Sequence, residues 1–313
     1  MFFEKYTDKT DGAIRGFDVK SSRVKMICIL IMVVCTVFGI IAMYPAFWVM
    51  FSGFKDLKEF TTEATLIPKS FKIDGFIETW KKLDFAIYYK NSFIMVIGCV
   101  ISAVIFNGLL AYGLAILKPK GHKIITGLVM WSLLIPATTS IVALFVNINR
   151  LGLNNSYIPL WLSYGANAFY VVLFKEFFEG LPQELIEAAK LDGCNVLQVF
   201  TRIILPMSKP IIMVIVIFSV TAAWSDFLLP YLVLNGSGKE TVMVKLYSYS
   251  TSRTTAIDMI RAIFFSIIPP TILFTLFQKQ ITDGAAGGAV KGEKTGNNIE
   301  EKYEKRTITK LER

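Results

Sequence analysis

The sequence predicts an all-α membrane protein with six transmembrane helices. Two observations predict this fold class. Hydrophobic residues make up 54% of the 313 residues and the mean hydropathy is +0.53, whereas soluble domains carry about 45–50% apolar residues. The apolar residues also gather in long uncharged stretches, most of which exceed the roughly 20 residues that cross a bilayer as a helix.

Six stretches are predicted to span the membrane. The fifth is interrupted by a single acid, and the sixth is short but has helix-tolerant flanks. In chain order the stretches are Met26 to Phe54, Asn91 to Leu117, Ile124 to Asn149, Leu151 to Phe174, Ile211 to Leu234 and Ala262 to Gln278. Residues 1–25 form a polar leader that is too long and too mixed in charge for a signal peptide, and no cleavage pattern follows it. We therefore expect the first span to stay in the mature protein.

The distribution of Lys and Arg predicts the orientation of the chain. With the N-terminus in the cytoplasm, most of these residues fall in the cytoplasmic segments, as the positive-inside rule requires. Both termini and residues 181–210 are then cytoplasmic. The net charge of +9 reflects mainly this bias, so we do not expect a nucleic-acid partner.

The first loop outside the membrane, residues 52–90, is rich in aromatic residues. They are typical of a membrane interface, and they would equally suit contact with an extracytoplasmic binding protein. Small residues around Tyr112 end the second span and favour close helix packing. Pro136 interrupts the third span.

Residues 181–210 are polar and helical between two apolar spans. Pro182 suits the start of a helix and Gly193 suits a stop about three turns later, which predicts a helix from Pro182 to Asp192. A second helix is expected over Val196 to Ile204, closed by Leu205 and Pro206. The segment is either a plain amphipathic linker or a surface that docks into a groove of another protein.

The docking interpretation is favoured by a resemblance. The segment is similar to the EAA loop of ABC importer membrane subunits, and more narrowly to the second permease of maltose-type oligosaccharide importers. The matching positions are Glu187, Ala188, Ala189, Asp192, Gly193, Phe200, Ile203, Leu205, Pro206 and Pro210. This resemblance implies a type I ABC importer permease fold and a coupling helix that inserts into a cleft of a cytoplasmic ATPase. The implied ATPase-coupling residues are Glu187, Ala188, Ala189, Asp192, Gly193, Phe200, Leu205 and Pro206.

The resemblance also implies partners and a location. They are a homologous second permease, two ATPase subunits, an extracytoplasmic solute-binding protein and the lipid of a bacterial inner membrane. ATP and Mg would bind to the ATPases, so this chain is expected to carry no cofactor and no catalytic activity. An oligosaccharide is the implied solute, while glycerol phosphate or another small solute remains an alternative.

Three residues are candidates for the substrate pathway. Asp226 is the single ionisable residue inside a predicted span, where a charge is costly unless it is paired or faces water. Trp224 would stack on a sugar ring or lie at the membrane interface. Asn107 would line a cavity or form a hydrogen bond between helices. The stretch from Trp224 to Leu228 resembles the same family, which more often has an amide at the position of Ser225.

Residues 235–261 form a second outer loop in which Tyr247 and Tyr249 are candidate contacts for the binding protein. Near the C-terminus, residues 287–295 approach a phosphate-binding loop, but Glu293 separates its glycine from its lysine and no strand precedes it. Residues 284–292 instead resemble the end of the permease family. We expect a transmembrane domain over 26–292 and a charged, flexible or marginally helical tail over 293–313.

The composition argues against other kinds of site. The four cysteines show no paired ligand spacing, and His122 is the one histidine of the chain, so neither a metal site nor a histidine-based catalytic site is expected. A membrane enzyme is disfavoured for the same reason. A stand-alone channel or secondary transporter is a remote alternative, because it would need more intramembrane charges or a repeat with broken helices.

Overall fold

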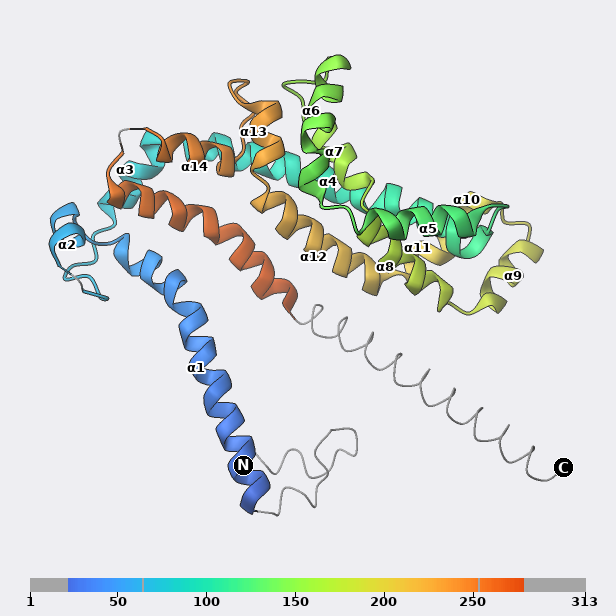
Figure 1. Ribbon diagram of the computed structural model, residues 1–313, viewed down its shortest axis with the longest axis horizontal. Helices are drawn as coiled ribbons and strands as arrows, with labels where there is room; N and C mark the ends of the chain where they lie inside the picture. Colours follow the sequence, from blue (N-terminus) through green and yellow to red (C-terminus); the bar gives the residue numbers. More distant parts are fainter. Residues whose placement is uncertain (1–21, 64, 253, 279–313) are drawn as a thin grey trace. The chain divides into compact units, whose positions relative to one another are not determined.

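The computed structural model describes residues 22–63, 65–252 and 254–278, and every regular element within them is a helix (Figure 1). The expectation of an all-α protein is confirmed for this part of the chain. The predicted tail 293–313 and most of the leader 1–25 lie outside the described residues. The chain divides into two compact units, residues 1–79 with 255–264 and residues 80–254 with 265–313.

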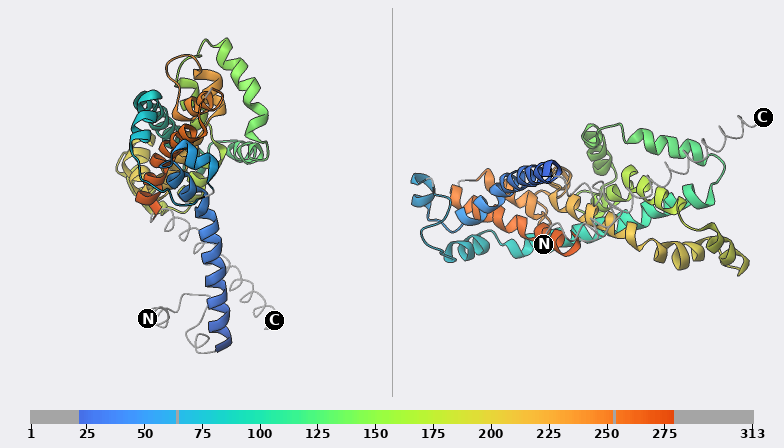
Figure 2. Two further views of the ribbon diagram at one scale, coloured as in Figure 1. Left: turned by 90° about the vertical axis from the view of Figure 1, so that its left-hand side faces the viewer. Right: turned by 90° about the horizontal axis from the view of Figure 1, so that it is seen from below.

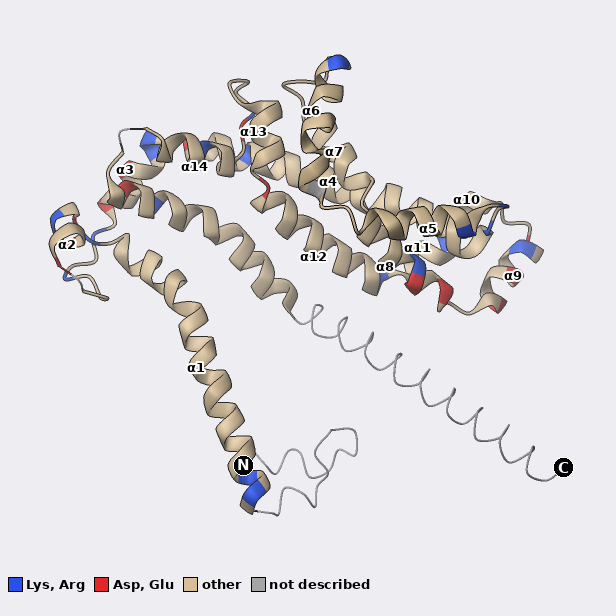
Figure 3. Cartoon of the chain, in the orientation of Figure 1, with Lys and Arg blue, Asp and Glu red and all other residues tan. Residues whose placement is uncertain are grey.

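The first unit contains the longest helix, α1 (Ser22–Ser52), followed by α2 (Leu57–Thr62) and most of α3 (Asp74–Lys82). The apolar side chains of α1 are exposed along almost its whole length. Its only charged residues lie in its first turns (Figure 3). Because so much exposed apolar surface is unfavourable in water, α1 must be covered by lipid or by another protein.

A buried arginine organises the loop that follows α1 in the first unit. Arg261 donates from Nε to the carbonyl of Gly53 at 2.9 Å and from Nη2 to the carbonyl of Lys55 at 3.2 Å. Its Nη1 lies 3.4 Å from a carboxylate oxygen of Asp258. A Cβ on Gly75 would clash with the guanidinium group, so a larger residue there would displace Arg261. These bonds fix the chain where α1 ends.

The second unit is built around α4 (Phe85–Tyr112), which continues into a π-helical turn, Gly113–Leu117. Most of the packing against α4 comes from α7 (Ile158–Gly165), α8 (Ala168–Glu179) and α12 (Lys209–Ser225) (Figure 2). Its other main helices are α5 (His122–Ser132), α6 (Ile141–Arg150), α9 (Gln183–Leu191), α10 (Val196–Val199), α11 (Leu205–Met207), α13 (Leu228–Leu234) and α14 (Val242–Ser250). A last helix, Ala256–Gln278, begins in the first unit and ends in the second.

Three described helices are long and apolar enough to cross a membrane alone: α1, α4 with its π turn, and Ala256–Gln278. They correspond to the first, second and sixth predicted spans. A fourth candidate joins Val196–Met207 to Lys209–Ser225, but these helices bend by 80°. Six continuous spans are therefore not observed, because the third, fourth and fifth predicted spans are each broken.

Each break contains a proline or a polar residue. The third predicted span ends its first helix at Ser132, and Pro136 with ψ 129° precedes a short 3₁₀ turn, Ala137–Ser140. The fourth is interrupted at Ala166 and Asn167, both outside helical geometry. The fifth is interrupted at Asp226, whose ψ of 127° is extended. A polar or cyclic residue inside an apolar stretch thus marks each break.

Candidate functional site

The first helix of the polar segment 181–210 is α9. It runs over Gln183–Leu191, with Pro182 at the N-cap position and Asp192 at the C-cap. This matches the helix predicted from Pro182 to Asp192 within one residue at each end. Glu184 lies in the first turn and Lys190 in the last, where each charge stabilises the helix dipole.

Gly193 ends α9 through its backbone conformation. Its φ is +81°, which a residue with a side chain rarely adopts. The N–H of Gly193 donates to the carbonyl of Lys190 at 3.1 Å, and the N–H of Cys194 donates to the carbonyl of Ala189 at 3.0 Å. These two bonds form a Schellman motif. A Cβ on Gly193 would meet nothing within 4 Å, so φ rather than space requires glycine.

The two alanines of α9 lie on different sides of the helix. Ala189 and Ile186 are buried, with 5% and 2% of their surfaces exposed. Ala188 is exposed together with Glu187, and Leu191 is 89% exposed. One side of α9 therefore belongs to the protein's own core, while the other presents a small residue, a carboxylate and an apolar side chain to the outside.

The second helix of the segment begins with a reciprocal cap. The side chain of Asn195 accepts from the N–H of Gln198 at 2.9 Å, and the side chain of Gln198 accepts from the N–H of Asn195 at 2.8 Å. This capping box starts α10 at Val196. The segment is therefore helix, glycine turn and helix, as the sequence predicts.

The prediction that Leu205 and Pro206 close this helix is wrong. After α10 the chain forms a π-helical turn, Phe200–Ile204, and continues through Pro206 to Met207. The N–H of Leu205 bonds to the carbonyl of Phe200, five residues back. This wider turn accommodates the ring of Pro206, which would clash with a carbonyl of a regular α-helix.

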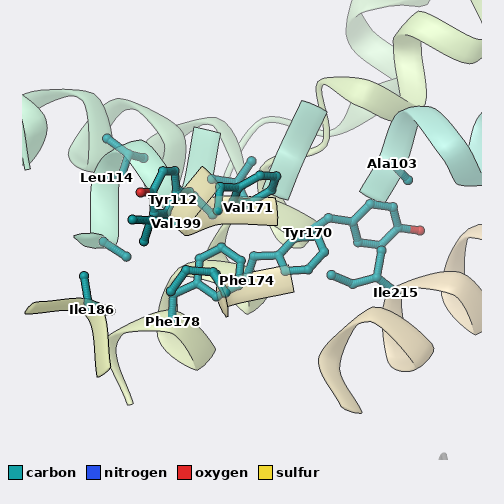
Figure 4. Close-up of a cluster of buried hydrophobic side chains, with 14 of the residues drawn as sticks. Ala103, Tyr112, Leu114, Tyr170, Val171, Phe174, Phe178, Ile186, Val199 and Ile215 are labelled. Carbon is teal, nitrogen blue, oxygen red and sulfur yellow. The ribbon is translucent and has the colours of Figure 1, made fainter. Parts of the chain in front are cut away.

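A buried aromatic contact anchors the segment to the end of α4. The Tyr112 hydroxyl donates to the carbonyl of Val196 at 3.0 Å. The rings of Tyr112 and Phe200 lie 5.1 Å apart, and both residues are buried. The same cluster contains Phe174 and Phe178 of α8 and reaches Ile186 of α9 (Figure 4). The small residues around Tyr112 predict only close helix packing, so this anchor was missed.

The predicted coupling residues therefore fall into two groups. Ala189 and Phe200 are buried in the cluster, and Leu205 is half-buried against it. The exposed group is Glu187, Ala188, Asp192, Gly193 and Pro206. Only the exposed group is available to another protein, while the buried group holds the segment to α4 and α8.

Asn107 has its polar groups satisfied within the chain. Its amide nitrogen donates to the carbonyls of Ala103 at 2.7 Å and Tyr164 at 2.8 Å. Its amide oxygen accepts from the N–H of Asn167 at 2.9 Å. Tyr164 and Asn167 flank the gap between α7 and α8, and Asn107 is fully buried. It bridges the broken fourth span.

Trp224 and Asp226 lie at the end of α12 in different surroundings. Trp224 is 4% exposed and its Nε1 donates to the carbonyl of Ser266 at 3.0 Å. Asp226 is partly exposed and lies at the break between α12 and α13. Asp226 thus keeps contact with the outside, whereas Trp224 does not.

Tyr247 and Tyr249, the candidate binding-protein contacts, also differ. Tyr247 is 44% exposed and lies against the rings of Phe227 and Tyr231, whereas Tyr249 is 8% exposed. Of the two tyrosines, only Tyr247 is exposed enough in this conformation to contact another protein.

Among the described residues, no group of three or more His, Cys, Asp and Glu is arranged to hold a metal ion.

The apolar helices and the anchored polar segment define a multi-pass helical membrane protein. Residues 19–283 match the sequence profile of the family described as "Binding-protein-dependent transport system inner membrane component". The chain belongs to this family, and it is the membrane component of a transport system.

The chain is similar to two named relatives and to one solved structure. It is 32% identical over 253 residues to the probable ABC transporter permease protein YurM of Bacillus subtilis, covering 80% of this chain and 84% of the relative. It is 27% identical to the diacetylchitobiose uptake system permease protein NgcG of Streptomyces coelicolor, covering 81% and 85%. A bacterial ABC transporter involved in the import of the acidic polysaccharide alginate has a chain of the same fold. Its TM-score is 0.73 at 22% identity, and the match covers 83% of this chain and 98% of that one.

Proposed function

We propose that the chain is a permease subunit of an ATP-driven, binding-protein-dependent importer of an oligosaccharide. Relatives named for diacetylchitobiose, arabinooligosaccharide and polygalacturonan transport support this solute class. The chain would form half of the pathway together with a homologous permease. Two ATPase subunits and a solute-binding protein would complete the transporter.

The observation that carries the proposal is the two-sided character of the polar segment. Its inner side is fixed to α4 and α8, while Glu187, Ala188 and Asp192 face outward. An ATPase bound to the outer side would move α4 and α8 with it, because the buried side chains of the inner side belong to one cluster with those of both helices. In this arrangement the exposed residues contact the ATPase and the buried residues transmit its movement to α4 and α8. Together they couple ATP hydrolysis to transport. The residues are Glu187, Ala188, Ala189, Asp192, Gly193, Phe200, Leu205 and Pro206.

The proposal includes a topology. The three broken spans would cross the membrane in two pieces each, which gives six passes with both termini in the cytoplasm. Non-helical backbone at membrane depth is tolerated where protein or a water-filled cavity surrounds it. The domain limits 26–292 and 293–313 belong to the same proposal.

Co-expression with its partner subunits tests the function. We expect an ATPase to remain bound to the chain in mild detergent, and solute-loaded binding protein to stimulate ATP hydrolysis in proteoliposomes. Uptake of a panel of labelled oligosaccharides, with glycerol phosphate as the comparison solute, would identify the solute class. Uptake without any ATPase would contradict the proposal, and uptake of glycerol phosphate alone would overturn the oligosaccharide assignment.

A further inference from the structure

Three aromatic rings gather where α12 ends and α13 begins. Phe227 lies at the break, Tyr231 lies one turn later on α13, and Tyr247 comes from α14 (Figure 1). The ring centroids are 5.3 Å apart for Phe227 and Tyr231, 4.7 Å for Phe227 and Tyr247, and 5.4 Å for Tyr231 and Tyr247. Each ring therefore contacts both others within the range that aromatic pairs favour. We refer to these three residues as the aromatic triad.

The aromatic triad is open, in contrast to the aromatic residues packed around Trp224. Tyr247 is 44% exposed, and Phe227 and Tyr231 are partly exposed. Around Trp224 the polar groups are used internally, because its Nε1 donates to the carbonyl of Ser266 and the Tyr89 hydroxyl donates to the carbonyl of Phe265. The Trp224 group is thus part of the protein's core, whereas the aromatic triad presents ring surface outward.

Two members of the aromatic triad also carry a polar group. Tyr231 and Tyr247 each have a hydroxyl group at the end of the ring. A tyrosine hydroxyl can both donate and accept a hydrogen bond. The site therefore combines an apolar ring surface with groups that form hydrogen bonds.

This combination matches the chemistry of a sugar. A pyranose ring has a face of C–H groups, which packs on an aromatic ring, and a rim of hydroxyl groups, which donate hydrogen bonds. Tyrosine suits such a site because its ring is apolar while its hydroxyl is polar. We propose that the aromatic triad binds one pyranose unit of the transported oligosaccharide. This inference rests on the proposed function and adds a solute contact to this chain.

The test uses the complete transporter in proteoliposomes and the oligosaccharide from the panel that the wild type transports best. Tyr247→Ala removes the most exposed ring, and Tyr247→Phe keeps the ring without the hydroxyl. The matched control is Trp131→Ala, which removes a ring of α5 that is 70% exposed. We expect Tyr247→Ala to lower kcat/KM for uptake about tenfold through a higher KM. Tyr247→Phe should stay closer to the wild type, and Trp131→Ala should leave KM unchanged.

A second measurement separates sugar contact from lipid contact, since tyrosines also collect at membrane interfaces. Tyr247→Trp introduces a fluorescent ring. Its fluorescence is obtained by subtracting the wild-type emission from that of the variant. We expect this emission to respond to the oligosaccharide and to be insensitive to brominated lipid. Quenching by brominated lipid would overturn the inference, and so would an unchanged KM in Tyr247→Ala. The proposed function would still hold in either case if the wild type takes up the oligosaccharide. If the wild type took up no oligosaccharide at all, the proposed function and this inference would both fail.

Discussion

The hydroxyl of Tyr112 donates a 3.0 Å hydrogen bond to the backbone carbonyl of Val196. Tyr112 ends α4, and Val196 begins the second helix of the polar segment. The bond therefore joins a membrane helix to the segment that we propose as the ATPase contact. Tyr112 is buried, so its hydroxyl needs a partner within the protein, and this bond fixes where α10 starts relative to α4.

Replacing Tyr112 by Phe removes this bond and keeps the ring packed on Phe200. We expect the free energy of unfolding to fall by about 0.5–1.5 kcal/mol and more ATP to be hydrolysed per solute imported. Thermal melting in detergent and paired uptake and ATPase assays measure the two effects. Tyr44→Phe is the control, because Tyr44 is 53% exposed on α1. An unchanged ratio of hydrolysis to uptake would show that this bond does not transmit movement.

Gly193→Ala tests the glycine turn between α9 and α10. The φ of +81° strains any residue with a Cβ, so we expect a loss of about 1 kcal/mol in the free energy of unfolding. Gly193→Asn should lose less, because asparagine tolerates this conformation better. Gly127→Ala is the matched control, since Gly127 lies inside α5 with open space around it. That variant should be neutral or slightly stabilised. Equal effects of alanine at both positions would contradict the proposed strain.

Substitutions at the two alanines of α9 distinguish a role in docking from a role in folding. Ala188→Arg places a large charge on the exposed side, so we expect normal melting but loss of ATPase binding during co-purification. Ala189→Leu overpacks the cluster around Phe200 and should lower stability by about 1–3 kcal/mol. If Ala188→Arg retained full ATPase binding and uptake, the outer side of α9 would not be the contact.

The sequence predicted the parts of this fold that depend on local chemistry. Pro182 and Gly193 bracket α9 as expected, because the proline suits a helix start and the glycine conformation permits a Schellman ending. The continuous spans α1 and α4 follow equally from long uncharged stretches. Such features are decided within a few residues of the chain.

Features that depend on distant residues were not predictable. The π-helical turn before Pro206 begins at Phe200, which packs against Tyr112 of a distant helix. The break at Asn167 depends on Asn107, sixty residues earlier on another helix. Nothing in the spacing of one sequence distinguishes Ala188 from Ala189 as outward and inward. Burial decides these roles, and it is a property of the assembled helices.

Asn107 offers the clearest case in which packing and transport roles can be told apart. Its side chain bonds to the carbonyl of Tyr164 and to the N–H of Asn167. Asn107→Leu preserves volume but leaves both backbone groups unpaired, which should lower the free energy of unfolding by about 1–3 kcal/mol. The matched control is Asn147→Leu, because Asn147 is exposed on α6. Thermal melting of the two variants gives the comparison.

The transport assay decides whether Asn107 also lines the substrate pathway. If Asn107 only bridges the two halves of the broken span, Asn107→Leu should lower the amount of folded transporter. The transporter that does fold should then have an unchanged KM. A pathway residue predicts the reverse, an altered KM with little change in melting. Because every polar atom of Asn107 already has a partner within the chain, we expect the first pattern. An altered KM would mean that α7 and α8 separate from α4 during transport and expose this amide to the solute.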